Sequence, residues 1–344
     1  MNKGLTMKVL VTGNKGYVGR ILSDLLIKEN IDAVGWDVEF YPAQFNEHKE
    51  IPTLNKDIRD ITIEDLSGIT DICHLGALSN DPLGEINSEL TVEINYKATI
   101  RLAELAKKAG VRKFVYSSSC SSYGANSEIV DENSELNPQT HYAKSKVNSE
   151  LDILKLKSDS FFPVILRNAT VYGYSSNLRL DLVVNNLTAS AFTTGKVKLL
   201  SDGTAWRPIL HVKDMARAFL KVINSSDSIV SGEVFNVGSN EENYTVKQIA
   251  NAVEELVSNS EITFGENASK DFRSYKVDFS KIKKQLGFST KFTVKDGINE
   301  LLDIFKRENF TEDDFKSERF YRLAQLKSKI QSKELDNELR FQER

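Results

Sequence analysis

Cysteine is scarce in this sequence. Only Cys73 and Cys120 occur among 344 residues. Two cysteines this far apart cannot build a disulfide framework, and neither has the neighbours that a metal-binding motif requires. We therefore expect a cytoplasmic protein, kept in a reducing compartment, with no metal site.

Long apolar runs are absent too. No stretch approaches the ~18 consecutive apolar residues that a membrane span needs. The apolar run at residues 8–12 is too short for the core of a secretory signal, and no cleavage pattern follows it. The sequence thus predicts neither a membrane span nor a membrane partner.

The chain also lacks a basic block. Its net charge is −4 with 27% charged residues, which argues against nucleic acid as the main partner. The 40% of hydrophobic residues allow a sizeable core, and the length suggests about two domains or one large one.

The first half alternates between two patterns. Short β-rich runs are separated by amphipathic stretches, which predicts parallel βαβ units with right-handed crossovers. The runs are apolar on both faces, as in a sheet that helices cover on both sides. The predicted strands are residues 7–13, 32–37, 71–76, 113–119 and 161–168, and the predicted helices are 17–30, 90–110 and 142–157.

After about residue 170 this rhythm loosens. We predict an α/β fold: a Rossmann-type doubly wound parallel sheet over residues 1–170, and a smaller C-terminal α/β substrate-binding domain over residues 171–310. Residues 311–344 are charged with interspersed aromatics, and we expect a helix packed on the body or on a partner. The second half suggests helices at 181–194, 212–224 and 246–257, and strands at 197–200 and 232–238.

A glycine pattern joins the first strand to the first helix. Gly13 lets the chain turn, Gly16 lets backbone N–H groups approach a pyrophosphate, and Gly19 lets the helix pack against the sheet. The phosphates would then meet the positive end of the helix. A tight turn without a ligand is the alternative.

An acidic residue follows the second strand. Asp37 stands where a carboxylate accepts hydrogen bonds from both ribose hydroxyls, so NAD is favoured over NADP. A simple turn residue is the alternative for Asp37. Asp57 and Ile58 follow a third strand, where an acid could reach the adenine amino group, although such residues also suit an ordinary loop.

Tyr142 and Lys146 lie four residues apart at the start of a predicted helix. This spacing puts both side chains on one face. They are either an ordinary surface pair, or a phenol whose pKa an ammonium group lowers.

These motifs and three further segments, in this order, resemble the extended short-chain dehydrogenase/reductase family, specifically its NAD-dependent nucleotide-sugar epimerases and dehydratases. The spacing Gly-x-x-Gly-x-x-Gly is that family's version of the glycine motif. The resemblance runs from about residue 7 to residue 305. The further segments are residues 74–77 (HLGA), residues 117–124 (SSSCSSYG) and residues 206–214 (WRPILHVKD), with Asn95 at a family position between the first two.

The resemblance implies a catalytic trio. Tyr142 would be the acid/base, its pKa lowered from about 10 by Lys146 and the bound nicotinamide. Lys146 would also hold the nicotinamide ribose, and Ser119 would hydrogen-bond the reacting oxygen, with Ser117 and Ser118 supporting the backbone. Further NAD contacts are implied for Lys15, Tyr17, Val18, Leu75, Gly76, Ala77 and Asn95, the last steadying the active site.

The resemblance also implies a substrate side. Arg207 would bind the substrate diphosphate through its planar fork, unless it forms a surface ion pair with Asp202 or Asp214. Thr170 departs from the asparagine of many members at a pyrophosphate contact. Implied substrate contacts are Ser79, Asn80, Ser119, Asn186, Leu187, Arg207, Asp271 and Arg273.

Two departures narrow the reaction. Where a 4,6-dehydratase carries Thr-Asp-Glu, this chain has Ser-Cys-Ser at 119–121, so elimination by that mechanism is not expected. The loop at 78–84 differs from that of UDP-galactose 4-epimerases, so the sugar need not be glucose or galactose.

We therefore expect an NAD-dependent nucleotide-sugar epimerase that oxidises a ring carbon, C4 being favoured, and returns the hydride to the opposite face. A nucleotide-4-keto-sugar reductase or sugar-nucleotide dehydrogenase with net redox is one alternative, and a non-catalytic NAD-binding regulator another. A homodimer built from helices 90–109 and 142–157 is also expected from the resemblance.

Overall fold

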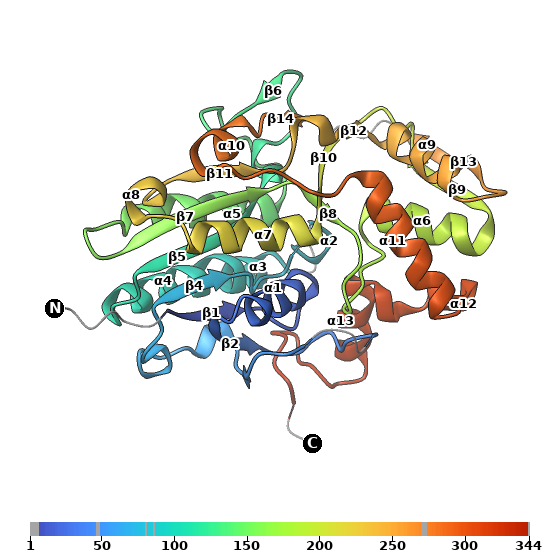
Figure 1. The fold of residues 1–344 in the computed structure, drawn as a ribbon. Coiled ribbons are helices and arrows are strands. Elements are labelled where there is room, and N and C mark those ends of the chain that lie inside the picture. The colour runs from blue at the N-terminus through green and yellow to red at the C-terminus, as the bar shows by residue number, and fades with distance from the viewer. Residues whose placement is uncertain (1–6, 46–48, 80, 85–86, 270–273, 343–344) are drawn as a thin grey trace.

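The computed structural model describes residues 7–45, 49–79, 81–84, 87–269 and 274–342. Its centre is a seven-stranded parallel sheet of order β11-β7-β5-β4-β1-β2-β3 (Figure 1). The chain leaves β1 in one direction and returns to its other side at β4, so the sheet is doubly wound, and the predicted Rossmann-type fold is confirmed. The strands are β1 (Lys8–Thr12), β2 (Asp32–Asp37), β3 (Thr53–Asn55), β4 (Asp71–His74), β5 (Lys113–Ser119), β7 (Phe162–Asn168) and β11 (Val234–Val237).

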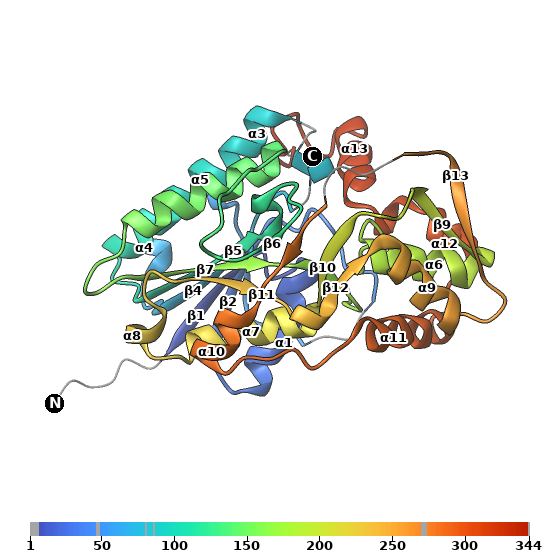
Figure 2. The same ribbon diagram turned by 90° about the horizontal axis from the view of Figure 1, so that it is seen from above.

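Helices cover both faces of this sheet (Figure 2). Successive residues of β1 pack into different hydrophobic clusters, because side chains point alternately to the two faces of the sheet along a strand. Val9 and Val11 belong to one buried cluster and Leu10 to the other. The strands are therefore apolar on both faces, as the sequence predicts. One face carries α1 (Tyr17–Lys28), α7 (Val212–Ile223), α8 (Asp227–Val230) and α10 (Ser280–Leu286), and the other carries α3 (Ser88–Val92), α4 (Ala98–Lys108) and α5 (His141–Lys155).

The helix predicted at 90–110 differs from a single α-helix. It is α3 and α4 joined by a π-helical turn at Glu93–Lys97. Such a turn frees a backbone carbonyl, and here the hydroxyl of Ser149 on α5 donates to Asn95 O at 3.1 Å. Sequence periodicity alone does not reveal this contact between two helices.

The second half builds a smaller assembly beside the sheet. Three short strands pair in the order β12-β10-β8, β13 pairs with β9, and β14 with β6. The predicted helices and strands occur close to their expected bounds, and β11 returns to the main sheet. The strands are β6 (Ile129–Val130), β8 (Thr170–Tyr172), β9 (Lys196–Ser201), β10 (Trp206–His211), β12 (Asn243–Thr245), β13 (Glu261–Ser269) and β14 (Lys276–Val277), and the helices are α6 (Val183–Thr194), α9 (Val246–Leu256) and α11 (Val294–Arg307).

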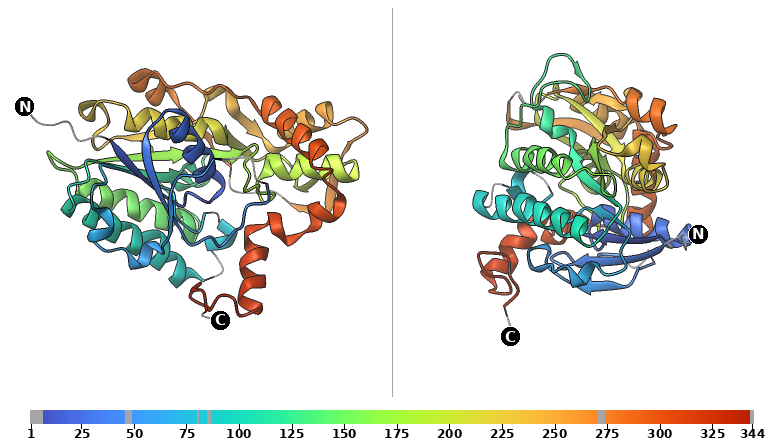
Figure 3. Two further views of the ribbon diagram at one scale, coloured as in Figure 1. Left: turned by 60° about the horizontal axis from the view of Figure 1, so that its bottom comes forward. Right: turned by 90° about the vertical axis from the view of Figure 1, so that its left-hand side faces the viewer.

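Residues 312–342 fold back onto the body (Figure 3). They contain α12 (Glu312–Lys316) and α13 (Arg322–Gln331). Phe320, Leu326 and Leu335 are each no more than 1% exposed. Of the two possibilities stated above, packing on the body is thus the one observed. Among the residues described, no helix has the length and apolarity to cross a bilayer.

Because the C-terminal residues share the main core, truncating one should destabilise the whole fold. We predict that Leu326→Ala lowers the free energy of unfolding by about 2–5 kcal/mol, the cost of a buried leucine cavity. The measurement is urea unfolding followed by intrinsic fluorescence. Leu54→Ala, at a position 58% exposed, is the control and should cost less than about 1 kcal/mol. Equal effects would mean that the C-terminal residues do not belong to the core.

Candidate active site

The carboxyl ends of the sheet strands open into one large cavity. Its volume is about 1140 Å³, and its walls come from both halves of the chain. Ligands of open α/β sheets bind at this edge. The predicted site residues that line it are Gly13, Gly16, Tyr17, Val18, Gly19, Asp37, Asp57, Ile58, Leu75, Gly76, Ala77, Ser79, Ser119, Tyr142, Lys146, Asn186, Leu187 and Arg207.

The glycine turn is shaped by close backbone approach. Gly13 has a φ of +73°, and a Cβ on Gly19 would lie 2.1 Å from Gly13 O. Gly16 caps α1 without a side-chain hydrogen bond. The N–H groups of the first helical turn are therefore left for an anion, and the turn fits a dinucleotide diphosphate.

Asp37 stands at the end of β2 beside this turn. Its carboxylate accepts hydrogen bonds from the backbone N–H groups of Lys15 at 2.9 Å and Glu39 at 2.8 Å. Burial raises the pKa of Asp37, which these two bonds oppose. The carboxylate is thus fixed at the cavity wall, and its remaining lone pairs suit ribose hydroxyls. The glycine turn and Asp37 together fit NAD.

Two predicted cofactor residues are not in the cavity wall. The ammonium group of Lys15 pairs with Glu50 at 2.8 Å, so only its backbone N–H serves Asp37. The side chain of Asn95 is buried and bonds the backbone N–H and O of Leu78 at 2.8 and 3.0 Å. Asn95 therefore holds the segment after β4, which suits a residue that steadies the site.

Asp57 borders the cavity, but its carboxylate has partners. Arg59 bonds it through Nε and Nη2, the shorter distance being 2.6 Å, and Arg340 approaches to 3.1 Å. The contact of Asp57 with adenine stays a prediction, and the ion pairs compete with it. Ile58 lines the cavity without a polar role.

The three residues predicted to be catalytic lie near one another in the structure. Thr140 caps α5 by accepting from Ala143 N at 3.1 Å, which places Tyr142 and Lys146 in the first two turns. Ser119, at the end of β5, lines the same cavity as Tyr142 and acts to lower the pKa of its phenol. Lys146 Nζ donates to Ser117 O at 2.8 Å and lies 5.7 Å from the centre of the Tyr142 ring. The three groups face one cavity.

Their protonation differs from the expectation for the loaded enzyme. Burial raises the pKa of Tyr142 to about 12, and Asp81 adds to this against Ser119 and Arg179. Burial lowers the pKa of Lys146 to about 7, which Glu150 opposes. In the chain alone, desolvation is the largest influence on the pKa of both groups, so a phenolate needs further positive charge.

On the substrate side, five predicted contacts line the cavity, Ser119 among them. Arg207 Nη1 donates to Trp206 O at 2.8 Å. Asp214, one of its possible ion-pair partners, instead pairs with Arg217. Thr170 and the predicted contacts Ser79, Asn186 and Leu187 are in the wall. Asn80, Asp271 and Arg273 lie outside the described residues.

Sequence reasoning missed several residues of the same wall. Arg179 donates to Ser79 Oγ at 3.1 Å and forms two 2.9 Å bonds with Asp181. Tyr321 and Arg322 arrive from the end of the chain. No sequence motif marks Arg179, Tyr321 or Arg322, because each reaches the cavity through contacts between segments that are distant in sequence. The interspersed aromatics of residues 311–344 were the only hint.

A doubly wound sheet with this glycine turn, an acid after β2 and a Ser-Tyr-Lys trio defines an NAD-dependent enzyme of the short-chain dehydrogenase/reductase type. The model of the NAD dependent epimerase/dehydratase family matches residues 9–238. The chain belongs to this family, and NAD is its cofactor.

The relatives extend this assignment. The chain is 27% identical over 321 residues to the UDP-glucose 4-epimerase of Mycolicibacterium smegmatis, covering 88% of this chain and 100% of the relative. It is 24% identical over 326 residues to the UDP-glucuronate 4-epimerase of Thermodesulfobacterium geofontis, covering 87% and 96%. Among solved structures it resembles MoeE5 in complex with UDP-glucuronic acid and NAD, with 26% identity, coverages of 88% and 99%, and a TM-score of 0.78.

The buried lysine predicts a pH dependence of stability. The pKa of Lys146 is about 7 in the folded protein against 10.5 as the ordinary value. Between these values the unfolded chain binds more protons, so the free energy of unfolding rises with pH. From pH 7 to pH 9 the ligand-free protein should gain about 1–3 kcal/mol relative to Lys146→Met.

Urea unfolding at the two pH values measures this gain. Lys144→Met, which removes an exposed lysine from the same helix, is the matched control and should follow the wild type. If Lys146→Met shows the same pH dependence as the wild type, the lysine is not held neutral by burial.

Proposed function

We propose that the protein is a nucleotide-sugar epimerase that oxidises and reduces a ring carbon, C4 being favoured, and keeps its NAD. One observation carries the proposal: Ser119, Tyr142 and Lys146 line the same cavity of about 1140 Å³ at the carboxyl edge of the sheet. The named 4-epimerases among the relatives support it. Residues 171–310 would supply most nucleotide-sugar contacts, including Asn186, Leu187 and Arg207.

Each of the three residues has its own role in the proposed reaction. Bound NAD supplies the acceptor and later the donor of the hydride. Tyr142 Oη takes the proton of the sugar hydroxyl. It returns this proton after the keto-sugar has rotated in the cavity to present its opposite face. Ser119 Oγ holds the same oxygen, and Lys146 supplies positive charge beside the phenol in its protonated form, which burial disfavours. The raised pKa of Tyr142 means that the phenolate forms only when the positive cofactor is present.

The neighbours of Ser119 speak against a 4,6-dehydratase. Cys120 is buried and its thiol donates to Arg167 O at 3.2 Å, while Ser121 Oγ donates to Ser119 Oγ at 2.9 Å. No carboxylate stands at these two positions to remove and return protons for elimination. A 4-keto-sugar reductase or sugar-nucleotide dehydrogenase uses the same trio and is the second candidate. A non-catalytic NAD-binding regulator would have no use for all three groups.

Removing the phenol tests the catalytic claim. We expect Tyr142→Phe to lower kcat about 10²–10⁴-fold, because acid/base catalysis is lost, while the NAD content of the purified protein stays unchanged. Tyr244→Phe is the control, since its hydroxyl bonds Glu242 outside the cavity. The measurement is conversion of nucleotide sugars together with bound NAD. Full biological activity in Tyr142→Phe would favour the regulator.

A homodimer through α4 and α5 is proposed as well. The two helices pack side by side on one face of the sheet (Figure 2). Val92 in the adjoining α3 and Leu151 on α5 leave 37% and 52% of their surfaces exposed. A second copy would cover such apolar surface.

Sedimentation at micromolar concentration should give a dimer for the wild type. Leu151→Arg places a charge in the proposed interface and should shift the protein to monomer. Leu54→Arg, at an equally exposed leucine on β3, should not. A wild type that sediments only as a monomer would rule the dimer out.

A further inference from the structure

The chain ends in a segment that reaches the cofactor side of the cavity. We call residues 317–342 the C-terminal segment. The family resemblance ends near residue 305, and the mycobacterial relative aligns over its whole length with only 88% of this chain. The C-terminal segment lies outside residues 9–238, which the family model matches, and after the last motif of the resemblance.

Apolar contacts and ion pairs hold the segment in place. Leu326, Leu335 and Leu339 are buried in the same cluster as Leu10 and Trp36 of the sheet. The segment is therefore part of the core of the NAD-binding half.

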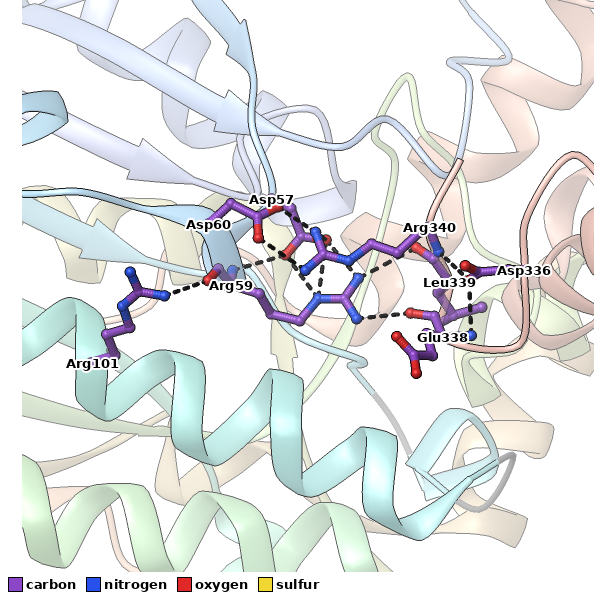
Figure 4. A network of polar contacts seen from close by, with 8 residues as sticks. All are labelled: Asp57, Arg59, Asp60, Arg101, Asp336, Glu338, Leu339 and Arg340. Carbon is purple, nitrogen blue, oxygen red and sulfur yellow. Dashed lines mark hydrogen bonds and ion pairs between the residues drawn. The ribbon is translucent and has the colours of Figure 1, made fainter. Parts of the chain in front are cut away.

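A polar network ties its end to the loop after β3 (Figure 4). Arg340 bonds the carboxylates of Asp57 and Asp60, at 3.1 Å from Asp57. Arg59 Nη1 donates to Glu338 O at 2.8 Å. Asp57 lines the cavity, so the segment braces a wall of the dinucleotide site.

Arg322 is the residue that brings charge to this wall. It begins α13, lines the cavity and is 2% exposed. Its guanidinium stacks on Tyr41 with 4.1 Å from Cζ to the ring centre, and Nη2 donates to Asn177 O at 3.1 Å and to Asn177 Oδ1. Asn177 Nδ2 in turn donates to Lys15 O at 2.8 Å and Tyr41 O at 2.9 Å. One amide therefore links Arg322 to the glycine turn.

Among the described residues, this cation has no direct ion-pair partner, and the carboxylates of Asp181 and Asp37 attract it only from beyond ion-pair distance. Nη1 of Arg322 is buried without a hydrogen-bond partner, and among the described residues no carboxylate lies within ion-pair distance of it. Its charged neighbour Arg179 is paired with Asp181 and repels it. Burial lowers the pKa of Arg322 to about 10, which still leaves it charged at neutral pH. A buried cation of this kind is costly unless an anion completes the site.

We propose that the C-terminal segment is part of the cofactor-binding site, and that Arg322 supplies positive charge to the diphosphate of NAD. A diphosphate could also come from the nucleotide sugar, since the cavity holds both. The link through Asn177 to Lys15 favours the cofactor, because the N-terminus of α1 that receives its diphosphate follows Lys15 directly. The inference rests on NAD dependence and not on which sugar is converted. It adds to the proposed function, because a cavity wall that the C-terminal segment holds in place slows the release of the NAD that the epimerase retains.

The test is a titration of the full chain, from which bound nucleotide has been removed, with NADH. Binding is measured by fluorescence. Arg322→Gln should weaken NADH about tenfold or more, since one charge near the diphosphate is lost. Its affinity for UDP, measured by calorimetry, should change less than twofold. Lys327→Gln removes an exposed charge from the same helix and should bind both ligands like the wild type. Arg322→Lys keeps the charge and should restore most NADH affinity.

Two outcomes overturn the proposal: unchanged NADH affinity in a folded Arg322→Gln, or weakened UDP with unchanged NADH. If the variant does not fold, hydrogen exchange of the wild type decides. NADH, but not UDP, should slow exchange in peptides covering residues 318–331, and equal exchange with and without NADH contradicts the proposal. These readouts need no sugar conversion, so their failure is distinct from failure of the epimerase assignment.

Discussion

The close packing of backbone at the glycine turn is the constraint on which the site depends. Gly13 and Gly19 approach so tightly that neither tolerates a Cβ: one on Gly19 would lie 2.1 Å from Gly13 O, and one on Gly13 would lie 2.9 Å from Gly76 N. This packing aims the first turn of α1 at the carboxyl edge of a sheet whose strands all end there. Asp37 at the end of β2, Ser119 at the end of β5, and Tyr142 and Lys146 on α5 then share one cavity.

Desolvation governs the chemistry inside that cavity. It holds the tyrosine protonated and pushes the nearby lysine towards neutrality in the chain alone. An additional positive charge reverses this balance for the phenol. Acid/base activity is thereby tied to an occupied cofactor site, which suits an enzyme that uses the same NAD for oxidation and reduction. Two arginines, Arg179 and Arg322, line the same cavity.

Sequence reasoning succeeded where the signal is local. The glycine spacing, Asp37 and the Tyr142–Lys146 pair each sit within one βα unit, and regular periodicity gave the strands and most helices. It failed where the local structure or the site depends on contacts between segments that are far apart in sequence. The π-helical turn before α4 contacts Ser149 of another helix. Arg322 bonds Asn177, which is 145 residues away in sequence, and Asn177 in turn bonds Lys15 at the glycine turn. The ion pairs of Asp57 with Arg340 are of the same kind.

We propose that the protein inverts a sugar carbon with an NAD that it retains. Proton NMR of the purified protein with UDP-, GDP-, CDP- and dTDP-sugars, without added cofactor, is the decisive measurement. We expect a new anomeric signal from one sugar, with no net oxidation or reduction. No change without cofactor, together with turnover of a keto-sugar once NADH is supplied, would contradict it and assign the protein to the reductases.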